Sequence, residues 1–488
     1  MSADPEIVVI GAGPAGVGAA LAAADTGART LIVDEAPTSG GQVYRTMPVE
    51  FRLKPNASPG PDYAIGEAQR KRLLASPVQT AFGRRIWNVS SDFRIDAIGP
   101  AGLESWRSQA LVVAAGATEK VVPFPGWTLP GVIGLAAATI LLKSQQMLPG
   151  ERTVVAGCGP LLAAVAVAII KGGGKVAAII DLSGPLDWLK VLPRMTSRRD
   201  LLGRGLGWLQ TIRRAGVPIL FRHMVKEVRQ SNGFLEVEAW PVDRDRRPHP
   251  GGRGLAGRGH AGQGSNFRAD CVTVGHGLVP ATEVTRLLRA DHEFRAEAGG
   301  WIAVRDADFR STRERVYVAG DGAGISGAAA AFLQGRIAGL TAALDLGKLD
   351  RAAHARATAL IRRRACKAER FGRAMAGMMT LRPGQLAAMT PDTIVCRCED
   401  VTRGEIDAAI ANGAREVNQL KAWTRCGMGP CQGRVCGEVA ATLVASRVGG
   451  REAAGIWTAR APLRPLSLAT MTGDYEYRDI PIPTAAPL

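Results

Sequence analysis

The amino-acid sequence predicts an α/β protein with two nucleotide-binding domains of the Rossmann type, followed by a small helical domain that binds a metal centre. Two observations lead to this prediction. A strand, a glycine-rich loop, a helix and a second strand are expected at residues 6–35, and the same pattern returns at 152–181. Most of the eight cysteines lie between residues 396 and 436. Successive β-α-β units build layered α/β folds, and clustered cysteines in such a chain indicate metal or redox chemistry.

The composition is that of a globular protein and argues against one function class. With 488 residues, of which 46% are hydrophobic and 22% are charged, the chain is long enough for about two to four domains. The formal charge of +17 would suit nucleic acid, an anionic membrane surface or an acidic partner. The arginines are spread along the chain without an aromatic-interleaved basic module, so we expect no nucleic-acid binding.

The apolar stretches predict neither a signal peptide nor a membrane span. Glycines interrupt the first apolar run at 7–24, and the longest run, at 161–170, is too short to cross a bilayer. We therefore expect a cytoplasmic protein, with peripheral attachment at the inner face of the membrane as the alternative.

The first glycine-rich pattern, EIVVIGAGPAGVGAALAAADTGARTLIVDE, predicts a dinucleotide site. In its G-x-G-x-x-G motif, Gly11 permits the turn, Gly13 lets the backbone approach a pyrophosphate, and Gly16 lets helix and strand pack closely. The start of the helix offers free N–H groups to the phosphates. Asp34, 23 residues after Gly11, can accept the ribose hydroxyls. The predicted contacts are Gly11, Gly13, Pro14, Ala15, Gly16, Asp34 and Glu35.

Three further stretches identify this dinucleotide as FAD through a resemblance. They are GGQVYR (40–45), LVVAAGATEK (111–120) and RVYVAGDGAGISGAAAAFLQGRIAG (315–339). Together they resemble the fingerprints of the two-dinucleotide-binding-domain flavoproteins of the glutathione-reductase-like type, over roughly residues 5–345. The resemblance implies that Asp321 holds the ribityl chain of FAD. The further FAD contacts that it implies are Gly41, Gln42, Ala115, Gly116 and Gly320.

The second glycine-rich pattern, at 152–181, departs from the first. Gly157 and Gly159 match the motif, but Leu162 stands at the third glycine and predicts a wider approach of helix and strand. In the resembled family this domain binds NAD(P)H. Three alternatives stay open here: NAD(P)H, an adenine nucleotide such as ATP with a structural role, or an empty site. A redox Cys-x-x-Cys near the flavin is missing, so we do not expect dithiol chemistry.

Two segments are interpreted as surface excursions from the second domain. Residues 187–216 are predicted to be helical, basic and partly apolar, which is typical of either a docking helix pair or a solvated face. Residues 243–268 are rich in glycine and arginine and are predicted to form a mobile loop or hairpin tip.

The clustered cysteines predict an iron–sulfur site. The spacing Cys396-x-Cys398-x32-Cys431-x4-Cys436 supplies the four thiolates that a [2Fe–2S] cluster needs. It resembles the bacterioferritin-associated-ferredoxin-like (BFD-like) [2Fe–2S] domain, although the second pair there is usually Cys-x-x-Cys. Cys426 competes with Cys436 for the fourth position and is ranked below it, and zinc is the rival metal.

These patterns predict five parts in order. They are an FAD-binding domain at 1–125 and 270–345, an inserted second nucleotide domain at 126–269, a helical connector at 346–390, a BFD-like domain at 391–450, and a C-terminal tail at 451–488.

The whole arrangement resembles the A (alpha) subunit of the multi-subunit bacterial FAD-dependent amine and opine dehydrogenases. That family includes octopine and nopaline oxidases, D-hydroxyproline dehydrogenase, dye-linked L-proline dehydrogenase and hydrogen cyanide synthase. The resemblance implies that a D-amino-acid-oxidase-like FAD beta subunit oxidises the substrate. This chain would then relay electrons through flavin and [2Fe–2S] to a quinone or a carrier protein. Further expectations are an FMN at the subunit interface and a small third subunit.

No catalytic residue is assigned to the chain itself. Two rival interpretations are kept. The first is a stand-alone NAD(P)H-dependent flavoprotein oxidoreductase with a fused ferredoxin domain. The second is a scaffold subunit whose nucleotide is structural.

Overall fold

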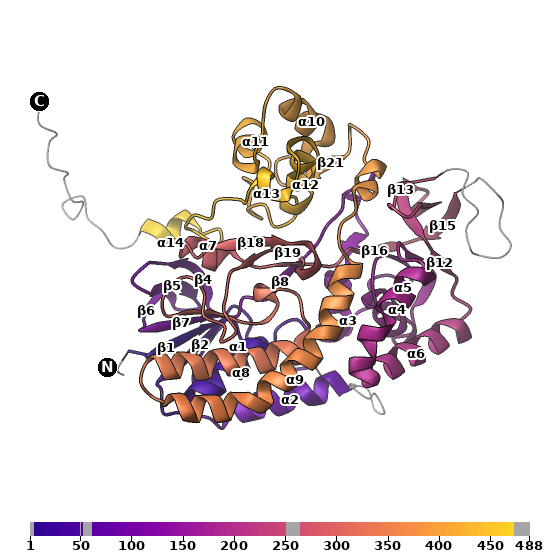
Figure 1. Cartoon of the computed structure of the whole chain (residues 1–488). Helices are drawn as coiled ribbons and strands as arrows, with labels where there is room; N and C mark the ends of the chain where they lie inside the picture. The colour runs from indigo at the N-terminus through magenta and orange to yellow at the C-terminus, as the bar shows by residue number, and fades with distance from the viewer. Residues whose placement is uncertain (1–3, 49, 52–60, 250–263, 473–488) are drawn as a thin grey trace, which may run out of the picture.

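A computed structural model describes residues 4–48, 50–51, 61–249 and 264–472 of the chain (Figure 1). The first glycine-rich pattern folds as predicted into a parallel sheet with the strand order β20-β7-β1-β2-β3. Its strands are β1 (Ile7–Ile10), β2 (Thr30–Asp34), β3 (Gln79–Phe82), β7 (Ala110–Val113) and β20 (Val316–Val318). Every residue of β1 and β7 is buried, which explains their continuous apolar runs.

Two helices that are rich in small residues cover one face of this sheet, and their backbones touch each other. Helix α1 (Pro14–Ala24) is buried along its whole length and packs on α8 (Ala328–Asp345). A Cβ atom at Gly335 of α8 would lie 1.8 Å from the carbonyl oxygen of Ala15. One at Gly339 would lie 2.2 Å from the carbonyl oxygen of Ala19. The two backbones therefore touch where the glycines lie, which fixes the start of α1 against the sheet.

Smaller elements complete this first domain. They are helix α2 (Pro61–Leu74), an antiparallel sheet of β4 (Arg85–Val89), β5 (Arg94–Gly99) and β6 (Gly102–Arg107), the pair β18 (His292–Arg295) and β19 (Gly300–Ala303), and the short helix α7 (Glu283–Leu287). Strands β8 (Ala117–Glu119) and β17 (Leu278–Pro280) pair where the chain leaves for the second domain and returns from it.

The second domain is built on another parallel sheet, with the strand order β12-β11-β10-β16-β9. Its strands are β9 (Val132–Gly134), β10 (Arg152–Gly157), β11 (Lys175–Asp181), β12 (Ile219–Phe221) and β16 (Cys271–Gly275). It also carries α3 (Leu135–Ser144), α4 (Leu161–Lys171), α5 (Pro185–Met195), α6 (Arg199–Arg214), and the antiparallel strands β13 (His223–Ser231), β14 (Phe234–Pro241) and β15 (Ser265–Ala269). The predicted helices in 187–216 are thus present as α5 and α6.

One predicted boundary differs from the structure. The sequence placed the return to the FAD-binding domain at residue 270, but β16 lies between β10 and β9 in the second sheet. The chain therefore leaves the second domain after Gly275. A short apolar run does not reveal which sheet it joins, because its partners are set by contacts far away along the chain.

The C-terminal part begins with the connector helix α9 (Arg351–Met378), which packs on α8 and then on α5 (Figure 1). The remaining elements are β21 (Ile394–Cys396), β22 (Val401–Thr402), α10 (Arg403–Ala411), α11 (Val417–Thr424), α12 (Gly437–Val448), α13 (Arg451–Ala454) and α14 (Leu468–Thr472). Thr402 and Glu405 form the predicted capping box at the start of α10. In the part of the chain that the structure describes, no helix is long and apolar enough to cross a membrane.

The backbone contact between α1 and α8 predicts a sharp response to one added methyl group. We expect Gly335→Ala to destabilise the protein by about 1–3 kcal/mol, because the new Cβ would overlap a backbone oxygen that cannot rotate away. Urea unfolding of the purified full-length chain measures the change. The matched control is Gly207→Ala in α6, where a Cβ meets nothing within 4 Å. That change should stabilise the protein by roughly 0.5–1 kcal/mol. Equal stability of the native chain and Gly335→Ala would contradict the packing argument.

Candidate cofactor sites

The first site is a bare backbone cradle at the carboxyl ends of β1, β7 and β20. Gly11 has a φ of 98°, and a Cβ there would lie 2.4 Å from the carbonyl oxygen of Ala114. A Cβ at Gly16 would lie 1.7 Å from the carbonyl oxygen of Gly11. Only glycine fits these two positions, so helix α1 can approach the sheet closely enough to direct its first N–H groups at a phosphate.

The remaining glycines of the cradle lie close to one another, backbone against backbone. A Cβ at Gly13 would meet only the Cα of Gly41, at 3.8 Å, so no side chain covers this backbone. On the other side, Gly320 contacts Ala15, and Gly116 lies close to Gly322. Residues from four distant stretches therefore meet at one edge of the sheet, as expected for an FAD pyrophosphate and flavin. Predicted contacts Gln42 and Ala115 lie on the exposed rim of this edge.

Two partly buried carboxylates border the cradle. Asp34 ends β2 and accepts hydrogen bonds from the backbone N–H groups of Ala12 and Ala36. Asp321 accepts from the N–H groups of Ser326, at 2.9 Å, and Gly327, at 3.1 Å. Burial raises the pKa of both carboxyl groups, while the hydrogen bonds lower it. Each oxygen of Asp34 accepts one of these bonds and Oδ1 of Asp321 accepts both of its two, so each carboxylate keeps lone pairs for a hydroxyl group.

Glu35 lies in a different setting from Asp34. It is exposed, and its carboxylate lies 4.0 Å from the guanidinium of Arg85. Asp34 is therefore the better placed of the two acids to accept ribose hydroxyls, and the FAD contacts as a set remain a prediction.

The second glycine-rich loop is covered by the protein's own chain. A Cβ at Gly159 would lie 2.7 Å from the Sδ atom of Met379, a residue that follows the connector helix α9. Leu162, which replaces the third glycine, is buried in the core beside Val155. Met379 therefore lies against the loop where a pyrophosphate would approach a Rossmann domain.

Arg246 holds the segment around Met379 in place over the second glycine-rich loop. Its guanidinium is almost completely buried and donates to the carbonyl oxygens of Met378, at 2.7 Å, and Thr380, at 3.1 Å. It also donates to Gln385 Oε1, at 2.9 Å. The expectation that 243–268 is a mobile excursion is therefore wrong for Arg246, while residues 250–263 lie outside the described residues. A glycine- and arginine-rich composition gave no signal for this contact.

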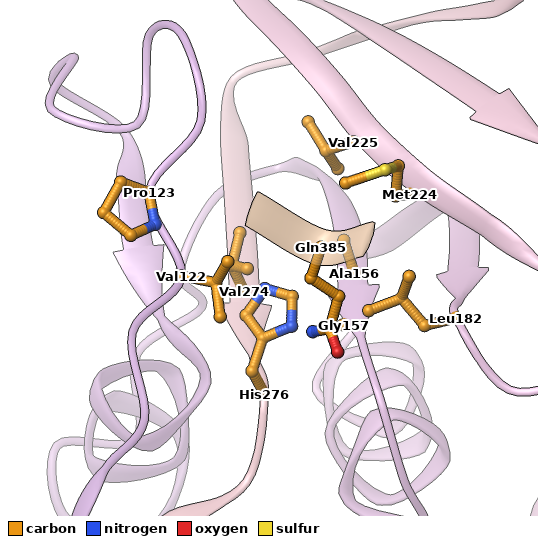
Figure 2. A pocket seen from close by; sticks show the side chains of 10 residues that line it. All are labelled: Val122, Pro123, Ala156, Gly157, Leu182, Met224, Val225, Val274, His276 and Gln385. Carbon is orange, nitrogen blue, oxygen red and sulfur yellow. The ribbon is translucent and has the colours of Figure 1, made fainter. Parts of the chain in front are cut away.

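The carboxylate that would bind the ribose in the second domain is also enclosed. Asp181 is buried and accepts from the N–H of Ser183, at 2.8 Å, and burial raises its pKa to about 7. The remaining cavity measures about 20 Å³, which is room for about one water molecule. Figure 2 shows His276 and Gln385 among the apolar side chains that line it. A dinucleotide would have to displace Met379 and Arg246.

The cysteines converge at one end of the C-terminal domain. The sulfur atoms of Cys396, Cys426 and Cys436 lie within 4.8 Å of one another. Cys398 and Cys431 are outside this group of three but lie near each other, close enough for Cys431 to affect the pKa of Cys398. The two predicted pairs are thus brought together, and Cys426, which the sequence ranked lower, is part of the same group. Three thiols converge and two more lie nearby, while a [2Fe–2S] cluster needs four, so the ligand set remains a prediction.

The local electrostatics suit thiolate ligands. Hydrogen bonds from the thiols of Cys426 and Cys436 lower the pKa of Cys396 to about 2. The same contact with Cys396 raises the pKa of Cys426 to about 12. A Cβ at Gly429 would lie 2.2 Å from the Cβ of Cys398, so the loop closes only with glycine there. Three thiols this close together suit a shared metal centre, which binds cysteines as thiolates.

A glycine cradle for FAD together with a cysteine centre defines a flavoprotein with a fused iron–sulfur domain. Comparison with known proteins gives the same class. Residues 5–347 match the model described as pyridine nucleotide-disulphide oxidoreductase, and residues 394–446 match the BFD-like [2Fe-2S] binding domain. The chain belongs to the pyridine nucleotide-disulphide oxidoreductase family, in the group that contains the A subunits of opine oxidases and carries a C-terminal BFD-like domain.

Its relatives match almost from end to end. The chain is 33% identical to the A subunit of opine oxidase from Rhizobium meliloti (strain 1021), over 95% of this chain and 97% of that protein. It is 30% identical to hydrogen cyanide synthase subunit HcnB of Pseudomonas protegens, over 96% of this chain and 97% of that protein. The fold also resembles L-proline dehydrogenase from P. horikoshii, with a TM-score of 0.65 at 18% identity, over 96% of this chain and 79% of that one.

The cysteine group leads to a prediction about cluster content. We expect the purified chain to hold about two iron ions and two acid-labile sulfides, and to give an EPR signal on reduction. Cys431→Ser should remove the signal while FAD stays bound, because the two sites lie in separate domains. Cys426→Ser is the matched change and should keep the cluster. Stoichiometric zinc without sulfide, or cluster loss in Cys426→Ser but not in Cys431→Ser, would contradict the assignment.

The covered loop of the second domain leads to a prediction about pyridine nucleotides. Because Met379 and Arg246 fill the approach to Gly159, NADH and NADPH should not bleach the flavin on the stopped-flow timescale. Photoreduction of the same sample should bleach it and serves as the positive control. Rapid bleaching by either nucleotide would show that the cover opens.

Proposed function

We propose that this chain is the electron-transfer subunit of a heteromeric FAD-dependent dehydrogenase. A partner beta subunit, resembling D-amino-acid oxidase, would oxidise the C–N bond of an opine, hydroxyproline or a related secondary amino acid. The observation that carries the proposal is the end-to-end match to the A subunit of opine oxidase, in a chain that also has both cofactor sites. Membership of an oxidoreductase family is the part that the comparisons support directly.

The residues of this chain would bind and separate the redox centres. When bound, FAD exchanges electron pairs and a [2Fe–2S] cluster exchanges single electrons. The cradle around Gly13 and Gly41 would hold FAD, and four of the five clustered cysteines would provide the cluster ligands. Met379 and Arg246 keep the second glycine loop covered. We assign no catalytic residue for substrate oxidation to this chain.

The second domain weighs against the rival interpretation of a stand-alone NAD(P)H oxidoreductase. That activity needs a nucleotide beside the flavin, and the approach to Gly159 is filled by Met379. An adenine nucleotide such as ATP in the second domain would meet the same obstacle. An FMN at a subunit interface stays part of the proposal, because such a site would need residues of a second chain.

The helices α5 and α6 are the surface that we propose for the partner. Leu189 and Leu206 are 62% and 69% exposed, and basic residues such as Lys190 and Arg199 lie between such leucines along the helices. An exposed apolar and basic face is typical of a docking surface. A cytoplasmic location, with peripheral attachment at the inner membrane face, a quinone or carrier-protein acceptor, and a small third subunit complete the proposal.

The test compares the chain alone with the chain co-expressed with the product of the neighbouring gene. Alone, it should show little dye-linked oxidation of octopine, nopaline, hydroxyproline or proline, because the substrate site would lie on the partner. Co-purified with the partner, it should support dye reduction. In the complex, Cys431→Ser should leave reduction of the partner flavin intact and slow the delivery of electrons to the dye. Vigorous amine oxidation by the isolated chain would overturn the relay proposal.

A further inference from the structure

The short helix α7 lies between the flavin cradle and the cysteine centre. Ala281, two residues before the helix, donates its N–H to the carbonyl oxygen of Gly116, at 3.0 Å. A Cβ at Gly322, in the loop that carries Asp321, would lie 3.4 Å from the carbonyl oxygen of Ala281. The start of α7 is therefore fixed to two of the loops that form the FAD cradle.

The side chains of α7 reach the cysteine loop. Glu283 Oε1 lies 2.7 Å from Arg434 Nε, and both side chains are more than four-fifths buried. Arg434 stands between two of the clustered cysteines, and its N–H donates to the carbonyl oxygen of Cys431, at 3.1 Å. One turn further, the guanidinium of Arg286 donates to the carbonyl oxygen of Trp457. Two arginine contacts thus join α7 to the C-terminal domain.

Trp457 covers the cysteine loop from the side that α7 holds. Its ring lies 3.0 Å from a Cβ built at Gly427 and 2.9 Å from one built at Gly437, so glycine is needed for the ring to pack there. The indole N–H donates to the carbonyl oxygen of Gly437, at 3.2 Å. Asn418 fixes the neighbouring backbone by accepting from the N–H of Thr458, at 3.0 Å.

We infer that α7 and Trp457 are positioning elements for the iron–sulfur centre. Glu283 and Arg286 hold the cysteine loop in a fixed position against the flavin cradle, and Trp457 excludes water from the loop. Solvent exposure and contacts around the sulfur ligands set the potential of such clusters. The inference rests on the proposed relay. In that relay, each electron that leaves the reduced flavin would reduce one ferric ion of the cluster, which passes it on. Two such transfers would return the flavin to its oxidised state.

The first experiment tests the cover. Trp457→Ala is compared with Trp423→Ala, since Trp423 belongs to the same domain but is 54% exposed. In the full-length holoprotein, Trp457→Ala should raise the reduction potential of the cluster, because water stabilises the more negatively charged reduced form. Loss of iron to a chelator should become about tenfold faster, the scale of other outer-shell changes at metal sites. Trp457→Phe should stay close to the native values.

Trp423→Ala should leave both measurements unchanged. Equal potentials and equal rates of iron loss in Trp457→Ala and Trp423→Ala would overturn the covering role. If Trp457→Ala yields no cluster at all, the measurements on Trp457→Phe decide. A native reduction potential with native iron loss supports the covering role. A potential and a rate of iron loss equal to those of unshielded small ferredoxins overturn it.

The second experiment tests the positioning by α7. Glu283→Gln removes the buried ion pair, and Glu293→Gln removes the exposed pair with Arg295 as its control. After photoreduction of the flavin, the cluster should become reduced more slowly in Glu283→Gln than in the control, at an unchanged cluster potential. Equal rates in both variants would overturn the positioning role. A native chain whose reduced flavin never reduces the cluster would overturn the relay itself, while the measurements on Trp457 would still stand.

Discussion

The cradle for FAD depends on the absence of side chains at a few backbone contacts. Gly16 packs directly against the carbonyl oxygen of Gly11, and Gly335 of α8 packs directly against that of Ala15. Helix α1 is therefore held between the sheet and α8 with no side chain between the backbones at these contacts. This contact aims the start of α1 at the edge where Asp34 and Asp321 lie. Bulkier residues would move the helix away from the sheet, and the loop that follows β1 would move with it.

The second nucleotide domain lacks the close glycine contact between helix and strand that the first domain has. The second domain keeps the turn glycines Gly157 and Gly159 but packs Leu162 at the third position. Its loop is then used for an internal contact with Met379 instead of a ligand. A glycine-rich loop in a Rossmann domain is therefore a site only when the space in front of it stays open, and that space is decided by residues distant in the sequence.

Much of this could be predicted from the sequence, because local patterns determine it. The hydrophobic pattern, the glycine spacing and the acidic residue at the end of the second strand located β1, α1 and Asp34. The cysteine spacing located the C-terminal centre. The cover on the second loop could not be predicted, since Arg246 lies in a low-complexity segment and Met379 at the end of a helix. The sequence could not show that Cys426 lies beside Cys396 and Cys436, because spacing orders cysteines along the chain but does not fold the loop between them. Trp457 gave no signal in a tail with no periodic pattern.

The connector has a consequence for how this chain can be divided. Residues 378–385 link the flavin part to the iron–sulfur domain, yet their carbonyl groups and Gln385 are the partners of a guanidinium deep in the second domain. Cutting the chain after α8 would remove these acceptors together with Met379, and would expose Arg246 and the second glycine-rich loop to water. The C-terminal third is thus not an exchangeable module. Grafts between such subunits must take the connector and the loop that contains Arg246 together.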